Sequence, residues 1–437
     1  MAMAREPRTS PIVPSYGESS LADLSASILA SMTDDESANT LGLPEASRVC
    51  LLVIDGLGLE LLRANQAAAP FLAELAFNSR PLTAGFPSTT VTSLASIGTG
   101  LVPAVHGMLG YQVAIPGAGR LLNGLHWPED IDPVGWQPHP TIFERAQVAG
   151  ITAVHVAPRA YADSGLTRAA LRGAQYRGAD SLGTLAALAS EALAESDSSL
   201  VAVYHGDLDA AGHQYGVSSP AWSFQLAHVD RLAEQLASSL PYGAVLYVTA
   251  DHGMVNVGSD DKIDTDGAAS ALRDGVALLG GEARARHVYA QPGAAAEVLA
   301  TWREVLGENA WVMSREEAVK DGWFGPPGTP GTADEAVAAR IGDVVAACAG
   351  SSAIIASRAE PRESALVGMH GSLTQAEQLV PMLAFSARLT PGVVPAVGPA
   401  PVRWRADGWR PRYPRPSAWP PPAWPPPPEA GGRPPAS

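Results

Sequence analysis

The chain has 437 residues, of which 46% are hydrophobic and only 17% charged, and its formal net charge is −15. A chain of this length and composition is typical of a globular protein with one large core or two smaller ones. The negative charge argues against a surface that neutralises nucleic-acid phosphates, so we expect no nucleic-acid polymer as a partner.

The same survey indicates a cytoplasmic protein without a membrane segment. The first residues contain no apolar stretch typical of a secretory signal, and no uninterrupted apolar run reaches membrane-spanning length. Cys50 and Cys348 stand in apolar or Ala-rich surroundings without zinc-ligand or disulfide spacing, so we expect both to be buried. The sequence does not indicate an oligomeric state.

Three regions are predicted along the chain. Residues 1–47 form an N-terminal extension around one predicted helix, Leu21–Met32. Residues 48–395 alternate predicted strands and helices, which favours an α/β domain with a mostly parallel sheet. Residues 396–437 are rich in proline and tryptophan and are predicted to be an extended or disordered tail.

Three apolar segments in the main region are predicted to be buried strands, and acidic residues follow each of them. In open α/β sheets, ligands bind beyond the carboxyl ends of the strands, so these acids mark the expected site. The segments and their polar followers are Val49–Ile54 with Asp55, Leu200–Tyr204 with Asp207 and Asp209, and Ala244–Val248 with Asp251 and His252.

Other elements are predicted from apolar periodicity and turn residues. A loop-rich stretch with a short hairpin is expected between Gly110 and Pro140. The expected strands are Ile151–Ala157, His287–Ala290 and Ala353–Ala356, and the expected helices are Glu60–Phe77 (interrupted at Pro70), Leu182–Ala194, Pro220–Leu240, Ala294–Val305 and Asp334–Ala347.

A segment rich in hydroxyl residues, Phe86–Gly100, follows the predicted helix Glu60–Phe77. Its apolar spacing favours a short helix that begins among the threonines, where free backbone N–H groups can stabilise an anion and a hydroxyl can be presented. The alternative explanation of these hydroxyl residues is that one of them simply caps the N-terminus of the helix. The pair Gly56 and Gly58 is a weak match to a dinucleotide-binding loop, because Leu61 stands where its third glycine would be.

Carboxylates and imidazoles at several sites form a candidate ligand set for two zinc-type ions. Asp209 and His213 are four residues apart, so one turn can direct both to one ion, and Asp207 is the competitor for that role. The full set is Asp55, Asp209, His213, Asp251, His252 and His370; we expect His106, His205 and His287 to be structural.

These motifs resemble the alkaline phosphatase superfamily, and the nearest match is its type I phosphodiesterase and nucleotide pyrophosphatase branch. The resemblance spans about Val49–Leu383 and depends on the number and order of the motifs. They are Val53-Ile-Asp55-Gly, Thr99-Gly-Leu-Val-Pro-Ala-Val-His106-Gly, Asp209-Ala-Ala-Gly-His213-Gln-Tyr-Gly, Ala250-Asp251-His252-Gly-Met and Met369-His370-Gly.

The resemblance implies an alkaline-phosphatase-like fold, with helices on both faces of the sheet and a smaller cap or insertion region. It implies a threonine nucleophile, and counting back from Thr99-Gly100 selects Thr90 over its neighbour Thr89. Ser93 stands where the family usually has an asparagine that binds the phosphoryl oxygens. The implied ligands are Asp55, Thr90, Asp251 and His252 for one zinc, and Asp209, His213 and His370 for the other.

The leading hypothesis is therefore a two-zinc hydrolase that cleaves phosphodiester or nucleotide pyrophosphate bonds of a small phosphorylated substrate. One alternative is a phosphomonoesterase, phosphomutase or phosphotransferase on the same scaffold. The other is a non-catalytic metal-binding protein whose tail makes the interactions.

Overall fold

The computed structural model describes residues 10–387 except 34, 78, 330, 332 and 333. The predicted tail, residues 396–437, and the boundary at residue 395 lie outside the described residues. Within the described part, no helix combines the length and the apolar character that a membrane span requires.

The largest sheet has six strands in the order β18-β8-β1-β7-β5-β6. All neighbouring pairs are parallel except β18 with β8, which confirms the predicted mostly parallel sheet. The strands are β1 (Arg48–Ile54), β5 (Thr152–Pro158), β6 (Gln175–Ala179), β7 (Ser199–His205), β8 (Val245–Thr249) and β18 (Leu383–Ser386).

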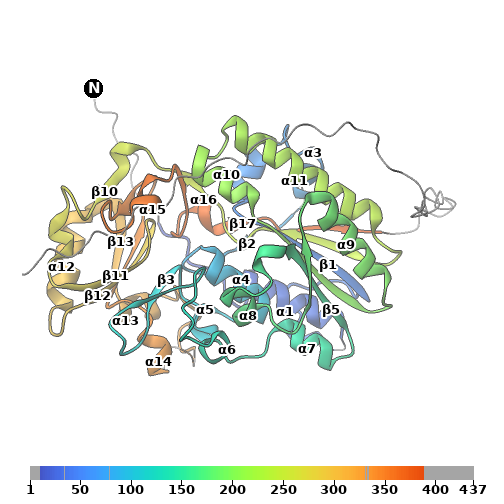
Figure 1. Ribbon diagram of the computed structural model, residues 1–437, viewed down its shortest axis with the longest axis horizontal. Helices are drawn as coiled ribbons and strands as arrows, with labels where there is room; N and C mark the ends of the chain where they lie inside the picture. Colours follow the sequence, from blue (N-terminus) through green and yellow to red (C-terminus); the bar gives the residue numbers. More distant parts are fainter. Residues whose placement is uncertain (1–9, 34, 78, 330, 332–333, 388–437) are drawn as a thin grey trace, which may run out of the picture. The chain divides into compact units, whose positions relative to one another are not determined.

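Helices cover both faces of this sheet, as expected (Figure 1). Because both faces are covered, its central strands are apolar along almost their whole length, and six of the seven residues of β1 are buried. One face carries α9 (Leu182–Ala194) and α11 (Pro220–Ser239), and the other carries α1 (Leu21–Ser31), α4 (Thr90–Thr99) and α7 (Ile142–Val148).

Helix α1 belongs to the same hydrophobic core, although it lies in the predicted N-terminal extension. Leu21, Leu24 and Ile28 are fully buried in that core, and α1 packs against α4. Its first turn is closed by a capping box between Ser20 and Asp23. The helix therefore contributes to the main fold, while the boundary at residue 47 stays a prediction.

A second sheet of four antiparallel strands, β11-β12-β14-β13, forms the smaller region. It has its own hydrophobic cluster, in which Trp302 of α12 (Ala295–Leu306) is fully buried. The strands are β11 (Val276–Glu282), β12 (Ala285–Ala290), β13 (Ala310–Ser314) and β14 (Val344–Cys348).

The predicted helix Asp334–Ala347 is wrong. The structure has only a short helix, α14 (Glu335–Ala338), followed by strand β14. All five residues of β14 are buried, and the strand pairs with both β12 and β13. The alanine-rich stretch favours a helix on local preference, but its place in the middle of a sheet decides otherwise.

The remaining elements are short and lie between the strands of the two sheets along the chain. The paired strands are β2 (Leu82–Thr83) with β17 (Leu379–Val380), β3 (Gln112–Ala114) with β4 (Leu121–Asn123), β9 (Val255–Asn256) with β16 (Gly368–Met369), and β10 (Lys262–Asp264) with β15 (Ala353–Ile355). The helices are α2 (Leu59–Ala64), α3 (Pro70–Ala76), α5 (Pro103–His106), α6 (Pro133–Trp136), α8 (Gly165–Ala170), α10 (Asp207–Tyr215), α13 (Arg315–Lys320), α15 (Pro361–Ala365) and α16 (Gln375–Gln378).

Candidate metal centre

The order of the central strands brings three predicted acids to one edge of the sheet. Strands β8, β1 and β7 are neighbours and parallel, so their carboxyl ends meet. Asp251 follows β8, Asp55 follows β1, and Asp209 lies in the first turn of α10 after β7. Gly56 permits the close approach, because a Cβ there would lie 3.1 Å from the Cα of Asp209 and the residue has a φ of +75°.

Asp55, Asp251 and His252 form one candidate ligand group. His252 Nε2 lies 3.3 Å from Asp55 Oδ1 and 3.5 Å from Asp251 Oδ2. One ligand atom from each residue lies within 4.8 Å of the others, and all three residues are buried. This spacing lets three protein atoms surround a single small cation.

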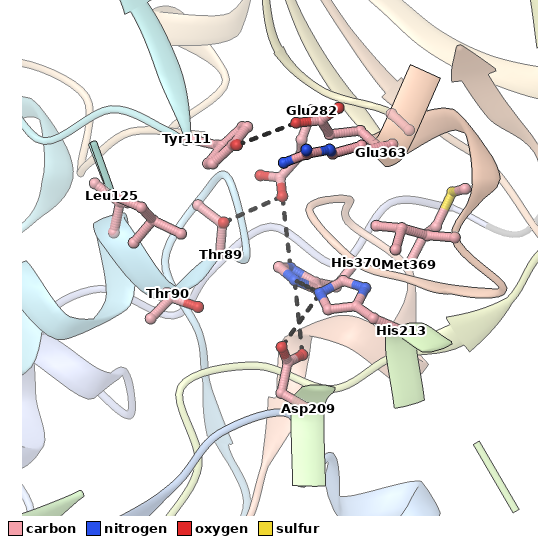
Figure 2. A pocket seen from close by; sticks show the side chains of 14 residues that line it. Thr89, Thr90, Tyr111, Leu125, Asp209, His213, Glu282, Glu363, Met369 and His370 are labelled. Carbon is pink, nitrogen blue, oxygen red and sulfur yellow. Dashed lines mark hydrogen bonds and ion pairs between the residues drawn. The ribbon is translucent and has the colours of Figure 1, made fainter. Parts of the chain in front are cut away.

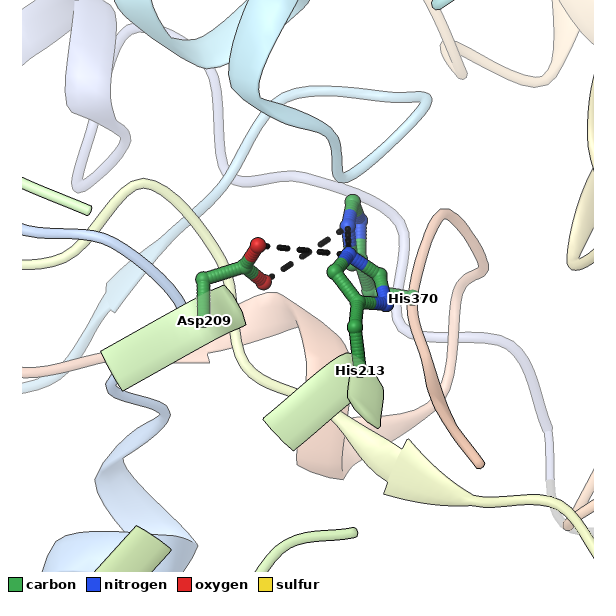
Figure 3. Close-up of side chains that lie close together, drawn as sticks. All are labelled: Asp209, His213 and His370. Atoms are coloured by element: carbon green, nitrogen blue, oxygen red, sulfur yellow. Dashed lines mark hydrogen bonds and ion pairs between the residues drawn. The ribbon is translucent and has the colours of Figure 1, made fainter. Parts of the chain in front are cut away.

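Asp209, His213 and His370 form a second candidate group (Figure 3). His213 Nε2 lies 3.2 Å from Asp209 Oδ2 one turn earlier on α10, and 3.3 Å from His370 Nε2. The His370 ring stacks on His252 of the first group, with 3.6 Å between the ring centroids. The two groups are therefore immediate neighbours.

All three histidines present the same nitrogen to the centre. The Nδ1 atom of each ring lies within hydrogen-bond distance of a backbone carbonyl: His213 with Gly368 at 2.8 Å, His252 with Gly253 at 3.0 Å and His370 with Ser88 at 3.0 Å. A carbonyl only accepts, so Nδ1 carries the proton and Nε2 is free to bind a metal.

The carboxylates of the centre have oxygens that no donor satisfies. Asp55 Oδ1, Asp209 Oδ1 and Asp251 Oδ2 are buried without a hydrogen-bond partner. Burial raises the pKa of Asp55 well above its usual range, and the nearby Asp251 and Asp209 raise it further. Such a set of carboxylate and imidazole atoms fits divalent cations, which would satisfy the free oxygens and offset the repulsion.

In the second group, attraction between opposite charges outweighs the effect of burial on the pKa values. Burial disfavours both charged forms, but the Asp209–His213 contact outweighs it. The pKa of Asp209 is therefore lowered, and the pKa of His213 is raised to about 9. Without a cation, His213 is the positive partner of Asp209; a bound metal ion would take over that role.

Thr90 is the first residue of α4, and its Oγ1 lies 3.3 Å from His252 Nε2. The hydroxyl of Thr89 points elsewhere and donates to Glu282 Oε2 at 3.1 Å. Ser93 is fully buried one turn further along α4 and lines neither cavity described below, so its substrate-binding role stays a prediction. The structure thus brings Thr90, not Thr89, to the first ligand group.

The competing residues lie apart from the two groups. The side chain of Asp207 is 73% exposed and lies 3.9 Å from His205, whereas the side chain of Asp209 is only 14% exposed. His205 contacts Gln225, and His106 contacts Ser96 and the Met108 amide. His287 is held between backbone groups of Leu109 and Gly342. Cys50 and Cys348 are buried and unpaired, as predicted.

Two cavities meet at Thr90. The first, which we call the His370 cavity, has a volume of about 330 Å³ and is bordered by His213, His370, Glu282 and Tyr111 (Figure 2). The second, the Tyr204 cavity, has a volume of about 400 Å³ and is bordered by Asp55 and Tyr204 with largely apolar walls. Thr90, Leu125 and Asp209 line both cavities.

Two contributors were not predicted from the sequence. Tyr204, the penultimate residue of β7, donates a very short hydrogen bond from its hydroxyl to Asp55 Oδ2. Glu282 reaches the site from the second sheet, and burial raises the pKa of its carboxyl to about 8. Tyr204 is the last residue of a predicted strand, so the sequence could have indicated its position near the site. No sequence pattern could have indicated Glu282, because only the tertiary fold brings β11 to the site.

Comparisons with known proteins identify the family of the chain. A family model described as type I phosphodiesterase / nucleotide pyrophosphatase matches residues 49–373. The chain therefore belongs to this family of the alkaline phosphatase superfamily, and it is a hydrolase of the phosphodiesterase/nucleotide pyrophosphatase type. The family typically binds divalent metals, and the two ligand groups are candidates for that binding.

Solved structures show the same fold at low sequence identity. Murine ectonucleotide pyrophosphatase / phosphodiesterase 5 has 19% identity and a TM-score of 0.61, with 78% of this chain and 88% of that chain covered. Phosphonoacetate hydrolase from Sinorhizobium meliloti 1021 has 21% identity and a TM-score of 0.59, with 81% and 93% covered. A search of curated protein sequences found no match.

Proposed function

We propose that the protein is a two-zinc enzyme that cleaves phosphodiester or nucleotide pyrophosphate bonds with Thr90 as its nucleophile. The observation that carries this proposal is the position of Thr90 Oγ1, 3.3 Å from Nε2 of His252 in the buried first ligand group, which adjoins the partly buried second group. Asp55, Asp251 and His252, with Thr90, would hold one ion, and Asp209, His213 and His370 would hold the other.

Zinc is favoured over other divalent metals by the types of ligand atom. Three of the six side chains in the two groups are imidazoles, and the other three are carboxylates. Calcium and magnesium prefer sites built only of oxygen, whereas mixed nitrogen and oxygen ligands suit zinc. When bound, two such ions lower the pKa of a neighbouring hydroxyl and stabilise negative charge on phosphoryl oxygens.

The proposed reaction has two steps, and both take place at the Thr90 hydroxyl. The Thr90 Oγ attacks phosphorus as its hydroxyl proton leaves to solvent, and the bond from phosphorus to the leaving oxygen breaks. The result is a phosphothreonine and an alcohol or phosphate product. Water then attacks the phosphothreonine, releases a phosphomonoester and restores the Thr90 hydroxyl. The first turn of α4 directs free backbone N–H groups towards the phosphoryl oxygens.

The two cavities support a substrate with a substituent on each side of phosphorus. Thr90 lies at their junction; the His370 cavity borders the second ligand group, and the Tyr204 cavity borders Asp55 of the first group together with Asp209. A phosphodiester or a pyrophosphate has two substituents that such cavities could accept, whereas a simple monoester would leave one of them empty. A threonine-to-alanine variant of the murine neighbour is inactive and was solved in complex with AMP, which supports a threonine nucleophile and a nucleotide substrate for this chain.

A panel of substrates tests this function. Metal-free protein would be loaded with zinc and assayed with 4-nitrophenyl esters that differ only in the second substituent: a nucleoside 5′-phosphodiester, a phenylphosphonate and the monoester. We expect the diester and phosphonate to be cleaved at least about tenfold faster than the monoester, in kcat/KM. Faster monoester cleavage, or transfer of the phosphoryl group to an added alcohol in place of water, would favour the alternative functions.

A further inference from the structure

A carboxyl from the second sheet contacts both parts of the proposed reaction centre. Glu282 ends strand β11, and its Oε2 accepts the hydrogen bond from Thr89, the residue just before the proposed nucleophile. The same Oε2 lies 3.6 Å from His370 Nδ1. In Figure 2 the dashed lines run from Thr89 to Glu282 and on to His370.

The chain makes room for this carboxyl. Gly371 directly follows His370, and a Cβ there would lie 2.9 Å from Glu282 Cγ. Gly371 also has a φ of +128°, which a side chain disfavours. Any other residue at position 371 would therefore push the His370 loop and Glu282 apart.

A second contact joins the same strand pair to the same loop. Arg284, which stands between β11 and β12, forms a two-armed, fully buried ion pair with Glu377, at 2.8 and 2.6 Å. Glu377 in turn accepts a hydrogen bond from the Ser372 backbone amide, two residues after His370. The β11–β12 connection thus holds the His370 loop at two points.

The buried carboxyl of Glu282 lowers the stability of the fold. Its Oε1 is buried without a hydrogen-bond partner. Among the described residues, the other buried carboxyl oxygens without a partner belong to Asp55, Asp209 and Asp251, the three carboxylates of the ligand groups. A buried carboxyl that is only half satisfied lowers stability, and such costs are common where function requires the group.

We infer that Glu282 is a positioning residue that orients His370 as a metal ligand and holds Thr89, so that Thr90 faces the centre. The Nδ1–H of His370 donates to the Ser88 carbonyl at 3.0 Å, and the Glu282 carboxyl, 3.6 Å from the same nitrogen, adds an electrostatic contact that favours this ring orientation and makes Nε2 a stronger ligand. The hydrogen bond to Thr89 fixes the first turn of α4. This inference rests on the proposed two-ion site.

The test compares Glu282→Gln with wild type and with Glu304→Gln, which makes the same carboxyl-to-amide change at an exposed position on α12. Zinc binding to the metal-free proteins would be measured by calorimetry, and unfolding by denaturant without metal. We expect Glu282→Gln to weaken binding of one of the two ions about 10–100-fold, while the free energy of unfolding stays equal or rises. Glu304→Gln should match wild type in both.

A third variant separates the two contacts. Thr89→Val removes the hydroxyl that donates to Glu282 but keeps the shape, so it should lower kcat and leave both ion affinities unchanged. Unchanged affinity for both ions in Glu282→Gln, or a loss of stability without a loss of affinity, would overturn the inference. If wild-type protein itself binds no zinc, the proposed function fails, and this result is distinct from a failure of Glu282 alone.

Discussion

The hydroxyl of Thr90 lies 3.3 Å from Nε2 of His252, although the two residues are 162 positions apart. The first residue of α4 therefore lies beside the residues that follow β8. Asp55, which follows β1, and Asp209, on the helix that follows β7, lie at the same edge of the sheet. A hydroxyl at a helix N-terminus beside carboxylates and imidazoles is the arrangement from which the proposed reaction follows.

Replacing Thr90 with alanine should remove nearly all turnover, by about 10³-fold or more, because the attacking oxygen is lost. Thr89→Ala should reduce turnover far less, since its hydroxyl donates to Glu282 and not to the centre. Steady-state kinetics of both variants, with circular dichroism as a check of folding, makes the comparison. Equal activity of Thr90→Ala and wild type would remove Thr90 from the mechanism.

His213→Ala and His370→Ala should share one phenotype, in which one ion is lost and one is retained. Their Nε2 atoms lie 3.3 Å apart, so both should serve the same ion. Elemental analysis of dialysed protein should give about one zinc per chain for each variant. Asp207→Ala is the matched control, because its exposed side chain lies outside the group; a metal loss there would reassign the ligand.

Tyr204→Phe should weaken the first ion about 10–100-fold without unfolding the protein. The hydroxyl of Tyr204 donates to Asp55 Oδ2 and so orients a proposed ligand, while the ring itself packs against the core. Competition with a chelator of known affinity would measure the change. If metal affinity in Tyr204→Phe equals that of wild type, Asp55 needs no such support.

The dependence of stability on pH should include a contribution from His287. Burial lowers the pKa of the His287 ring to about 4, although the hydrogen bond from its Nε2 to the Leu109 carbonyl opposes this shift. The Nδ1 atom accepts a hydrogen bond from the Gly342 amide, which a protonated ring could not keep. A histidine with a depressed folded-state pKa stabilises above its ordinary pKa of about 6.5, and that stability is lost as pH falls towards 4, by up to about 1.4 kcal/mol per pH unit.

The variant His287→Gln measures that contribution. It should be less stable at pH 7, but its unfolding free energy should fall less than that of wild type between pH 6.5 and 4.5. The buried carboxyls Asp55 and Glu282 titrate in the opposite direction, because burial raises their pKa. The informative quantity is therefore the difference between variant and wild type, and parallel pH profiles would contradict the assignment.

Much of the centre could be predicted from the sequence, because its ligands follow buried apolar strands. Asp55 directly follows such a strand, Asp251 stands two residues after another, and the four-residue spacing of Asp209 and His213 fits one helical turn. His370 could be counted among the candidate ligands from the sequence, but its assignment to the same ion as Asp209 and His213 followed only from the family resemblance. Local sequence patterns therefore predict the ligands that lie at the ends of the parallel strands.

The second sheet could not be predicted in the same way. Strand β14 is alanine-rich and becomes a strand only because β12 and β13 flank it. Glu282 reaches Thr89 across 193 positions, and no sequence periodicity signals such a contact. Non-local pairing decides both features, which is why they required the structure.

The most direct test of the two-ion threonine mechanism is a zinc titration of metal-free protein in which diester cleavage and bound zinc are measured together. We expect activity to rise to a plateau at two zinc ions per chain, to vanish reversibly with chelator, and to be absent from Thr90→Ala at the same zinc content. Full cleavage by wild-type protein in chelator, with no zinc bound, would contradict this mechanism.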